Sequence, residues 1–211
     1  MGGIFNPESG LMKGLSYMGD LMILNFLYML CCIPVITIGP AAAALYTIAL
    51  KMAKEEDAGI VKPFFKAFKE NFRKALVIWI IFLLLGAVIW FGSGVVKADP
   101  QKFPFIISAV YTAVAIAAWL TVSWVFALQA RYENTIKNTI KNAFILGAAN
   151  PLKSLVIMLL TALIPGLFLF ATYIFLRLSV IWFLLGFSGT AVINSVLMHK
   201  AFDRINTEES L

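Results

Sequence analysis

The chain has 211 residues, of which 61% are hydrophobic and only 13% are charged, against roughly 25% charged residues in soluble domains. This composition excludes an ordinary soluble domain and predicts an all-α integral membrane protein, folded as one compact helical bundle over residues 1–211. The net charge of +6 would indicate nucleic-acid binding in a soluble protein. Because the basic residues flank long apolar stretches, we assign them to membrane orientation and expect no nucleic-acid partner.

Five apolar stretches predict five transmembrane helices, since roughly 18 apolar residues suffice to cross the hydrocarbon core. They cover about residues 20–38, 75–96, 104–130, 152–176 and 178–198. A straight helix from Asp20 to Leu50 would be about 46 Å long, so we expect the first helix to be broken at Gly39-Pro40. Pro165-Gly166 predicts a kink in the fourth helix. Only Arg177 marks the boundary between the fourth and the fifth.

The distribution of lysine and arginine predicts the orientation of the chain. Seven lie between the first and second helices, four between the third and fourth, and two after the fifth. These thirteen fall on one side of the membrane, and only four fall on the other. The positive-inside rule then places the N-terminus outside and the C-terminus in the cytoplasm of a bacterial plasma membrane.

The segment over residues 63–74 predicts a first amphipathic cytoplasmic helix. Pro63 suits a first helical turn because its missing N–H is not needed there. At 100° per residue, Phe64, Phe65, Phe68 and Phe72 share one face, opposite the four basic residues of the segment. Such a helix lies flat on a membrane, with its rings toward lipid and its cations toward anionic head groups. It also fits a docking surface for the cytoplasmic subunit of a partner, and the two interpretations can coexist.

A second amphipathic cytoplasmic helix is predicted over residues 134–148. The sequence repeats Asn-Thr-Ile-Lys from Asn134 and again from Asn138, and continues with Asn142. The four-residue spacing places the three asparagines on one helix face. Since asparagine is a mediocre helix former, we consider two interpretations of this row: a solvated face and a face that recognises a partner.

No charged residue lies in the middle of any predicted membrane helix. Ion-coupled carriers usually place ionisable groups at membrane depth, so this pattern argues against an autonomous ion-coupled transporter. Asn25 and Asn194 are polar residues within the helices, and we expect each to bond a neighbouring helix rather than the other. Ala109, Ala113 and Ala117 form a small-residue stripe that allows close helix approach, either within this bundle, which we favour, or to another protein.

We predict no catalytic, cofactor-binding or metal-binding residues and therefore no enzyme. The single histidine, His199, has no carboxylate or cysteine at ligand spacing, and one histidine does not make a usual zinc site. No phosphate-binding glycine loop or nucleophile with a visible base is present in the sequence.

Short segments throughout the chain resemble the YesL-like family of bacterial membrane proteins. They are Asn25, Ile33-Pro34, Thr37-Ile38-Gly39-Pro40-Ala41, Ala44-Leu45-Tyr46 with Lys51, Phe64-Phe65-Lys66-Ala67-Phe68-Lys69, Asn71-Phe72, Arg131-Tyr132-Glu133-Asn134-Thr135, Asn142-Ala143, Gly186-Phe187-Ser188 and Asn194-Ser195. The resemblance implies a small multi-span protein of Gram-positive bacteria, whose gene often lies beside those of carbohydrate ABC importers. It supplies no catalytic residues.

We therefore expect a non-enzymatic membrane accessory subunit that assists oligosaccharide uptake by binding the transmembrane or ATPase subunits of an ABC importer. The expected contact residues are the four phenylalanines Phe64, Phe65, Phe68 and Phe72, the asparagines Asn134, Asn138 and Asn142, and the alanines Ala109, Ala113 and Ala117. The alternative is an independent small carrier or pore, as a monomer or an oligomer, built around broken or kinked helices. An intramembrane enzyme ranks behind both.

Overall fold

The computed structural model describes residues 10–54, 56, 59–98, 105–170 and 179–208. All elements in these residues are helical, which confirms the predicted all-α class. They are α1 (Gly10–Cys32), the short 3-10 helix η1 (Val35–Thr37), α2 (Ile38–Met52), α3 (Val61–Ala98), α4 (Phe105–Arg131), α5 (Ile136–Ala149), α6 (Pro151–Phe170) and α7 (Ser179–Glu208).

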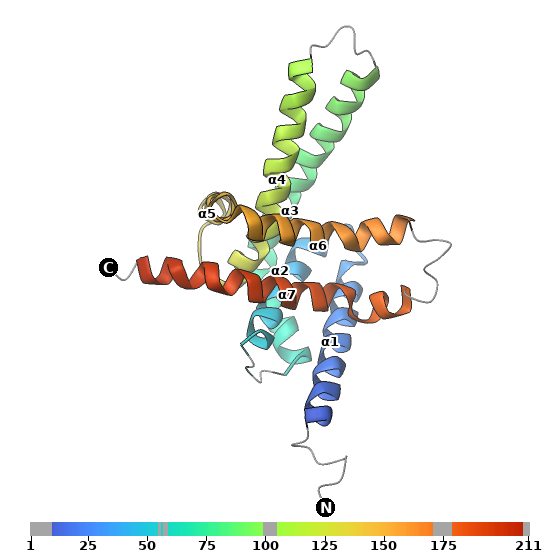
Figure 1. The fold of residues 1–211 in the computed structure, drawn as a ribbon, viewed down its shortest axis with the longest axis vertical. Helices are drawn as coiled ribbons and strands as arrows, with labels where there is room; N and C mark the ends of the chain where they lie inside the picture. Colours follow the sequence, from blue (N-terminus) through green and yellow to red (C-terminus); the bar gives the residue numbers. More distant parts are fainter. Residues whose placement is uncertain (1–9, 55, 57–58, 99–104, 171–178, 209–211) are drawn as a thin grey trace, which may run out of the picture.

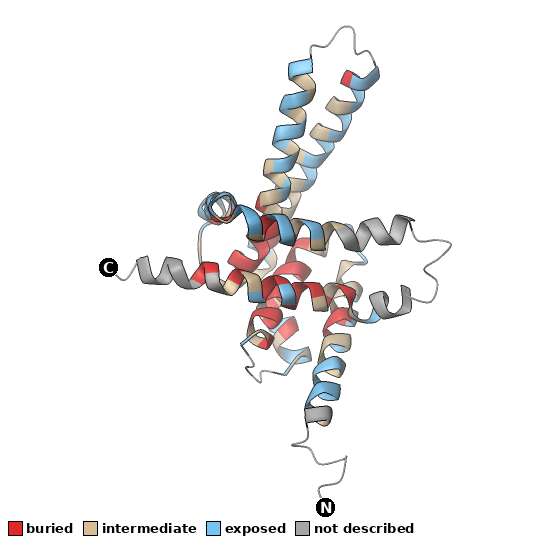
Figure 2. Ribbon diagram, viewed as in Figure 1, coloured by how far each residue is buried: buried red, intermediate tan, exposed pale blue. Residues whose placement is uncertain are grey.

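The helices radiate from a common centre instead of forming the compact bundle predicted from the sequence. Figure 1 shows α3 and α4 extending together on one side, α1 extending on the opposite side, and α6 and α7 crossing between them. Buried residues gather where these arms meet, and the outer parts of α1 and of the α3–α4 hairpin are largely exposed (Figure 2). A large apolar surface is therefore left uncovered by the chain itself.

Helix α2 lies at the centre of the core. Twelve of its fifteen residues are buried, among them the four alanines of 41–44. Such small side chains let neighbouring helix backbones approach closely. Around α2, the core is completed by large rings, for example Trp124 of α4 and Phe202 of α7, whose ring centroids are 6.1 Å apart.

The break after the first helix occurs at residues 33–37, so the predicted break at Gly39-Pro40 is wrong. Helix α1 ends at Cys32, and the Thr37 hydroxyl donates to the Cys31 carbonyl at 2.6 Å. The indole N–H of Trp79 holds the turn from α3 by donating to the Val35 carbonyl at 2.8 Å. Gly39 and Pro40 instead lie in the first turn of α2, where proline is tolerated because its absent N–H has no helical partner.

Within the described residues, four helical segments are long and apolar enough to cross a membrane: Met12–Cys32, Val35–Met52, Val61–Ala98 and Phe105–Arg131. A fifth exists if Ile136–Ala149 and Pro151–Ala162, which meet at an angle of 109°, form one bent span. The predicted third helix over residues 104–130 agrees closely with α4. The junction of the predicted fourth and fifth helices falls in residues 171–178, outside the described residues, and α6 stays helical through Pro165-Gly166.

The two predicted cytoplasmic helices also differ from the structure. Residues 63–74 are not a separate helix but the first part of the continuous helix α3. Helix α5 begins at Ile136, after the N-cap residue Thr135, whose side chain accepts a hydrogen bond from the backbone N–H of Asn138. Asn134 therefore precedes the helix and does not continue the asparagine row along it.

Candidate functional site

The most connected polar contact in the core joins the first and last helices. Asn25 of α1 is fully buried, and its side-chain carbonyl accepts hydrogen bonds from the backbone N–H groups of Phe187, at 2.9 Å, and Ser188, at 3.0 Å. A carbonyl that receives two consecutive amides acts as an N-cap side chain does at the start of a helix, although here it comes from another helix. Asn25 thus fixes α1 against α7.

A second polar contact lies further along α7. The side-chain amide of Asn194 donates to the hydroxyl of Tyr46 on α2 at 3.3 Å, and Asn194 is fully buried. Its carbonyl oxygen has no donor among the described residues. The prediction that Asn25 and Asn194 each bond a neighbouring helix, and not one another, is confirmed. We call the five residues Asn25, Tyr46, Phe187, Ser188 and Asn194 the polar seam.

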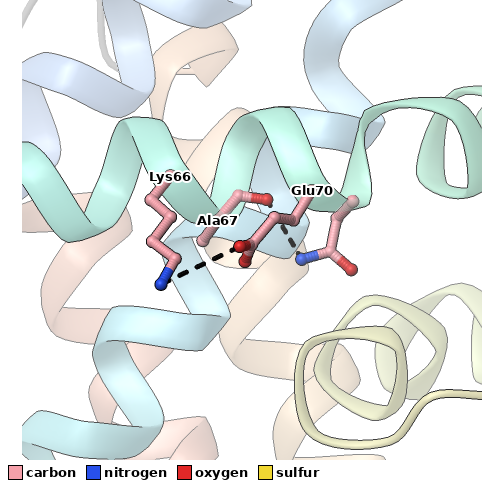
Figure 3. A network of polar contacts seen from close by, with 4 residues as sticks. Lys66, Ala67 and Glu70 are labelled. Carbon is pink, nitrogen blue, oxygen red and sulfur yellow. Dashed lines mark hydrogen bonds and ion pairs between the residues drawn. The ribbon is translucent and has the colours of Figure 1, made fainter.

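A third contact joins α3 to α4 near the start of α3. The Gln129 side chain donates to the Asn71 side-chain carbonyl at 3.1 Å, and the Asn71 amide donates to the Ala67 carbonyl at 3.0 Å. Figure 3 shows the bond to Ala67 beside the ion pair of Lys66 with Glu70, which measures 4.0 Å. That ion pair is exposed, so it adds little stability. The part-buried bond of Gln129 to Asn71 is the one that joins the two helices.

The sharp turn between α5 and α6 is held by a chain of two hydrogen bonds. The indole N–H of Trp124 on α4 donates to the Ser154 hydroxyl at 2.9 Å, and this hydroxyl donates to the Gly147 carbonyl at 2.7 Å. Gly147 has no room for a side chain, because a Cβ there would lie 2.9 Å from Leu120 of α4. The bend is therefore anchored on α4.

The four phenylalanines of the predicted contact face have different environments. Phe64 is fully buried in the core, Phe68 and Phe72 are half-buried, and Phe65 is 46% exposed. The prediction that all four rings face lipid or a partner is therefore wrong for Phe64. Amphipathic spacing identified the apolar face of this segment, but the core of this same chain covers its centre.

The three asparagines and the three alanines are largely accessible. Asn138 and Asn142 are exposed on α5, and Asn134 is half-buried before it. Ala109 and Ala113 are exposed on α4, so the interpretation that the stripe packs within this chain is wrong for these two residues. The remaining residue, Ala117, is half-buried on α4, and Thr121, one turn further along the same face, is buried.

The buried polar side chains of the described core are amides and hydroxyls of asparagine, glutamine, serine and threonine. These groups donate and accept hydrogen bonds, and they join helices within a membrane protein. Within the described residues, no group of three or more histidine, cysteine or acidic side chains is placed to hold a metal ion. The polar seam therefore has the chemistry of helix association.

Sequence reasoning identified both asparagines of the polar seam but missed their partners. Tyr46 and Ser188 belong to segments that carry the family resemblance, Ala44-Leu45-Tyr46 and Gly186-Phe187-Ser188, yet nothing in the sequence pairs them. The pairs are separated by 148 residues for Tyr46 and Asn194, and by 163 for Asn25 and Ser188. The one signal of this pairing in the sequence is that all four residues belong to segments that carry the family resemblance.

Two comparisons with known proteins match this chain. The family described as "Protein of unknown function, DUF624" matches residues 21–92, which include α2 and most of α3. The uncharacterized protein YesL of Bacillus subtilis (strain 168) is 26% identical over 185 residues, covering 86% of this chain and 83% of YesL. No solved structure matches. The two matches confirm the resemblance stated from the sequence.

Proposed function

Since this chain is YesL-like over most of its length and has several helices able to cross a membrane, we propose that it is an accessory membrane subunit of a carbohydrate ABC importer. In this proposal it catalyses no reaction and assists oligosaccharide uptake by binding the transmembrane or ATPase subunits of the importer. The carbohydrate part rests on the family resemblance, because genes of such proteins often lie beside those of carbohydrate importers.

The observation that carries the proposal is the uncovered apolar surface of the diverging arms. Trp90 and Phe91 on α3 and Phe105 and Ile106 on α4 are each at least 69% exposed. Figure 2 shows this exposure along both helices of the hairpin. In a membrane such faces meet either lipid or the helices of another subunit. A subunit that joins a larger assembly needs lateral faces of this kind.

One of these faces is suited to close helix packing. Ala109 and Ala113 are exposed on α4, four residues apart, and small residues at this spacing let a partner helix approach. We therefore propose that this stripe contacts a transmembrane subunit of the importer. On the cytoplasmic side, the exposed Asn138 and Asn142 of α5 are the proposed contacts for an importer subunit.

The proposed location is the bacterial plasma membrane, with the N-terminus outside and the C-terminus in the cytoplasm. The support is the excess of basic residues from the end of α2 through the first part of α3, and from the end of α4 to the start of α6. This orientation requires α1 and α2 together to cross an odd number of times. If Met12–Cys32 and Val35–Met52 each cross, the N-terminus lies in the cytoplasm instead.

The experiment that tests the function is purification from the native membrane in a mild detergent, followed by mass spectrometry of the proteins that accompany the chain. We expect an importer's transmembrane or ATPase subunits to be recovered with the wild-type protein. Replacing Asn138 and Asn142 by tryptophan should reduce that recovery without preventing membrane insertion. If the variant recovers as much of the importer subunits as the wild type, α5 is not part of the contact with the importer.

The alternative, an independent small carrier or pore, has one observation in its favour, the interruption of the chain between α1 and α2. Interrupted helices form binding sites in several transporter folds. If the protein purifies alone and moves an oligosaccharide across a vesicle membrane after reconstitution without other proteins, the accessory proposal is wrong and the carrier takes its place.

A further inference from the structure

An open apolar groove of about 300 Å³ runs between α3 and α4. Its walls on α3 include Trp79, Gly86 and Ile89, and its walls on α4 include Ala115, Ala118 and Trp119. Small residues line its middle, and it exists because Gly86 presents no side chain: a Cβ there would have nothing within 4 Å. The polar atom of Trp79 is already bonded to the Val35 carbonyl, so the groove offers no hydrogen-bonding group from this ring.

The surface of α3 indicates where this groove lies relative to the membrane. Up to Lys74, the exposed positions of α3 carry mostly charged side chains, whereas from Val77 to Val95 they are uncharged and mostly large and apolar. Lysine returns at Lys97. The stretch between Lys74 and Lys97, 22 residues or about 33 Å of helix, matches the hydrocarbon core of a bilayer. The groove, which begins at Trp79 and ends at Ile89, lies entirely within this part.

The size of the groove matches that of a hydrocarbon chain. From Trp79 to Ile89 the helix rises by about 15 Å. A helix of that length is about 10 Å in diameter, so only its side chains would enter an open groove of this size. A hydrocarbon chain is about 4–5 Å thick, because non-bonded carbons meet at about 4 Å, so 15 Å of it occupies about 250 Å³. The groove volume therefore matches one hydrocarbon chain of this length.

We propose that the α3–α4 groove is a binding site for one acyl chain of a membrane phospholipid. The acyl chain lies along Gly86, between the indoles of Trp79 and Trp119. It fills the space between the two helices where their side chains do not meet. Its contacts replace those that a bulkier residue at position 86 or 118 would make. This site is separate from the importer contact, since Ala109 and Ala113 do not line the groove.

The test is native mass spectrometry of the full-length protein purified in mild detergent, with four proteins compared. They are the wild type, Gly86→Leu, Ala118→Leu and the matched control Gly94→Leu. Gly94 lies on the same helix, also has open space at its Cβ, and does not line the groove. All four are first compared by circular dichroism, so that each is known to be folded helix.

We expect the wild type and Gly94→Leu to retain one phospholipid, and Gly86→Leu and Ala118→Leu to lose it by about tenfold or more, because the new side chain occupies the chain's place. Because the two groove variants lie on different helices, the test still gives a result if one of them fails to fold. Retention of the lipid by a folded groove variant, or its absence from the wild type, overturns the proposal. A second copy of the chain in place of lipid also overturns it.

Discussion

Asn25 and Ser188 lie 163 positions apart in the sequence and are joined by a 3.0 Å hydrogen bond from the Ser188 backbone N–H to the Asn25 side-chain carbonyl. The same carbonyl receives the N–H of Phe187. These bonds join α7 to α1, beside the rings of Tyr28 and Phe187, whose centroids are 5.2 Å apart.

Replacing Asn25 by alanine should destabilise the fold by about 1–3 kcal/mol, because the buried N–H of Ser188 and the part-buried N–H of Phe187 lose their acceptor. The measurement is thermal unfolding in detergent, followed by circular dichroism. Asn142→Ala is the control, since Asn142 is exposed on α5. Equal unfolding temperatures for the two variants would mean that the Asn25 contact contributes nothing to stability.

The contact of Tyr46 with Asn194 predicts a non-additive pair of substitutions. Tyr46→Phe should cost about 1–2 kcal/mol, because it leaves the buried Asn194 amide without an acceptor. Adding Asn194→Leu should recover part of this loss, since replacing both partners removes the unpaired polar group. A double variant that loses more free energy of unfolding than the two single variants together would contradict the hydrogen bond.

Gly39→Ala should destabilise the protein by about 1–3 kcal/mol, as overpacking does in tightly packed cores. A Cβ at position 39 would lie 2.6 Å from the Ala75 carbonyl and 2.5 Å from the Trp79 Cβ, so α2 and α3 would have to separate. Gly94→Ala is the control, because nothing lies within 4 Å of its Cβ and alanine favours helix. Equal stability of the two variants would refute the close approach of α2 to α3.

Cysteine labelling tests the proposed orientation in intact cells, after Cys31 and Cys32 are replaced. An impermeant reagent should label Ser9→Cys and Gln101→Cys but not Ser210→Cys, because the basic segments stay in the cytoplasm. Labelling of Ser210→Cys without Gln101→Cys would reverse the orientation. Labelling of Gln101→Cys alone would show that α1 and α2 cross separately and that the N-terminus is cytoplasmic.

The helices themselves were predictable because their determinants are local. The apolar stretch over residues 104–130 predicted α4 to within one residue at each end, since length and hydrophobicity alone define such a segment. The position of the first break was not predictable in this way. Both Pro34 and Pro40 offered a break, and the choice depends on the bond from Trp79 to Val35, 44 positions away.

The sequence also did not predict what covers each helix face, because this too depends on contacts between distant residues. The spacing of Phe64 and Phe68 identified an apolar face, but periodicity does not distinguish a face covered by lipid from one covered by α2. Likewise the alanine stripe of α4 predicted close packing without saying on what. The directions of the arms depend on long-range contacts such as that of Asn25 with Ser188.

The most direct test of the central proposal is photo-crosslinking in native membranes from a benzoyl-phenylalanine placed at Ala113. Ala113 is exposed on α4 and lies on the proposed contact stripe. The control position is Tyr111, whose side chain lies against Gly92 of α3 and should crosslink only within the chain. We predict an adduct between position 113 and a transmembrane subunit of an ABC importer. Adducts only with lipid or with a second copy of this chain would contradict the accessory-subunit proposal.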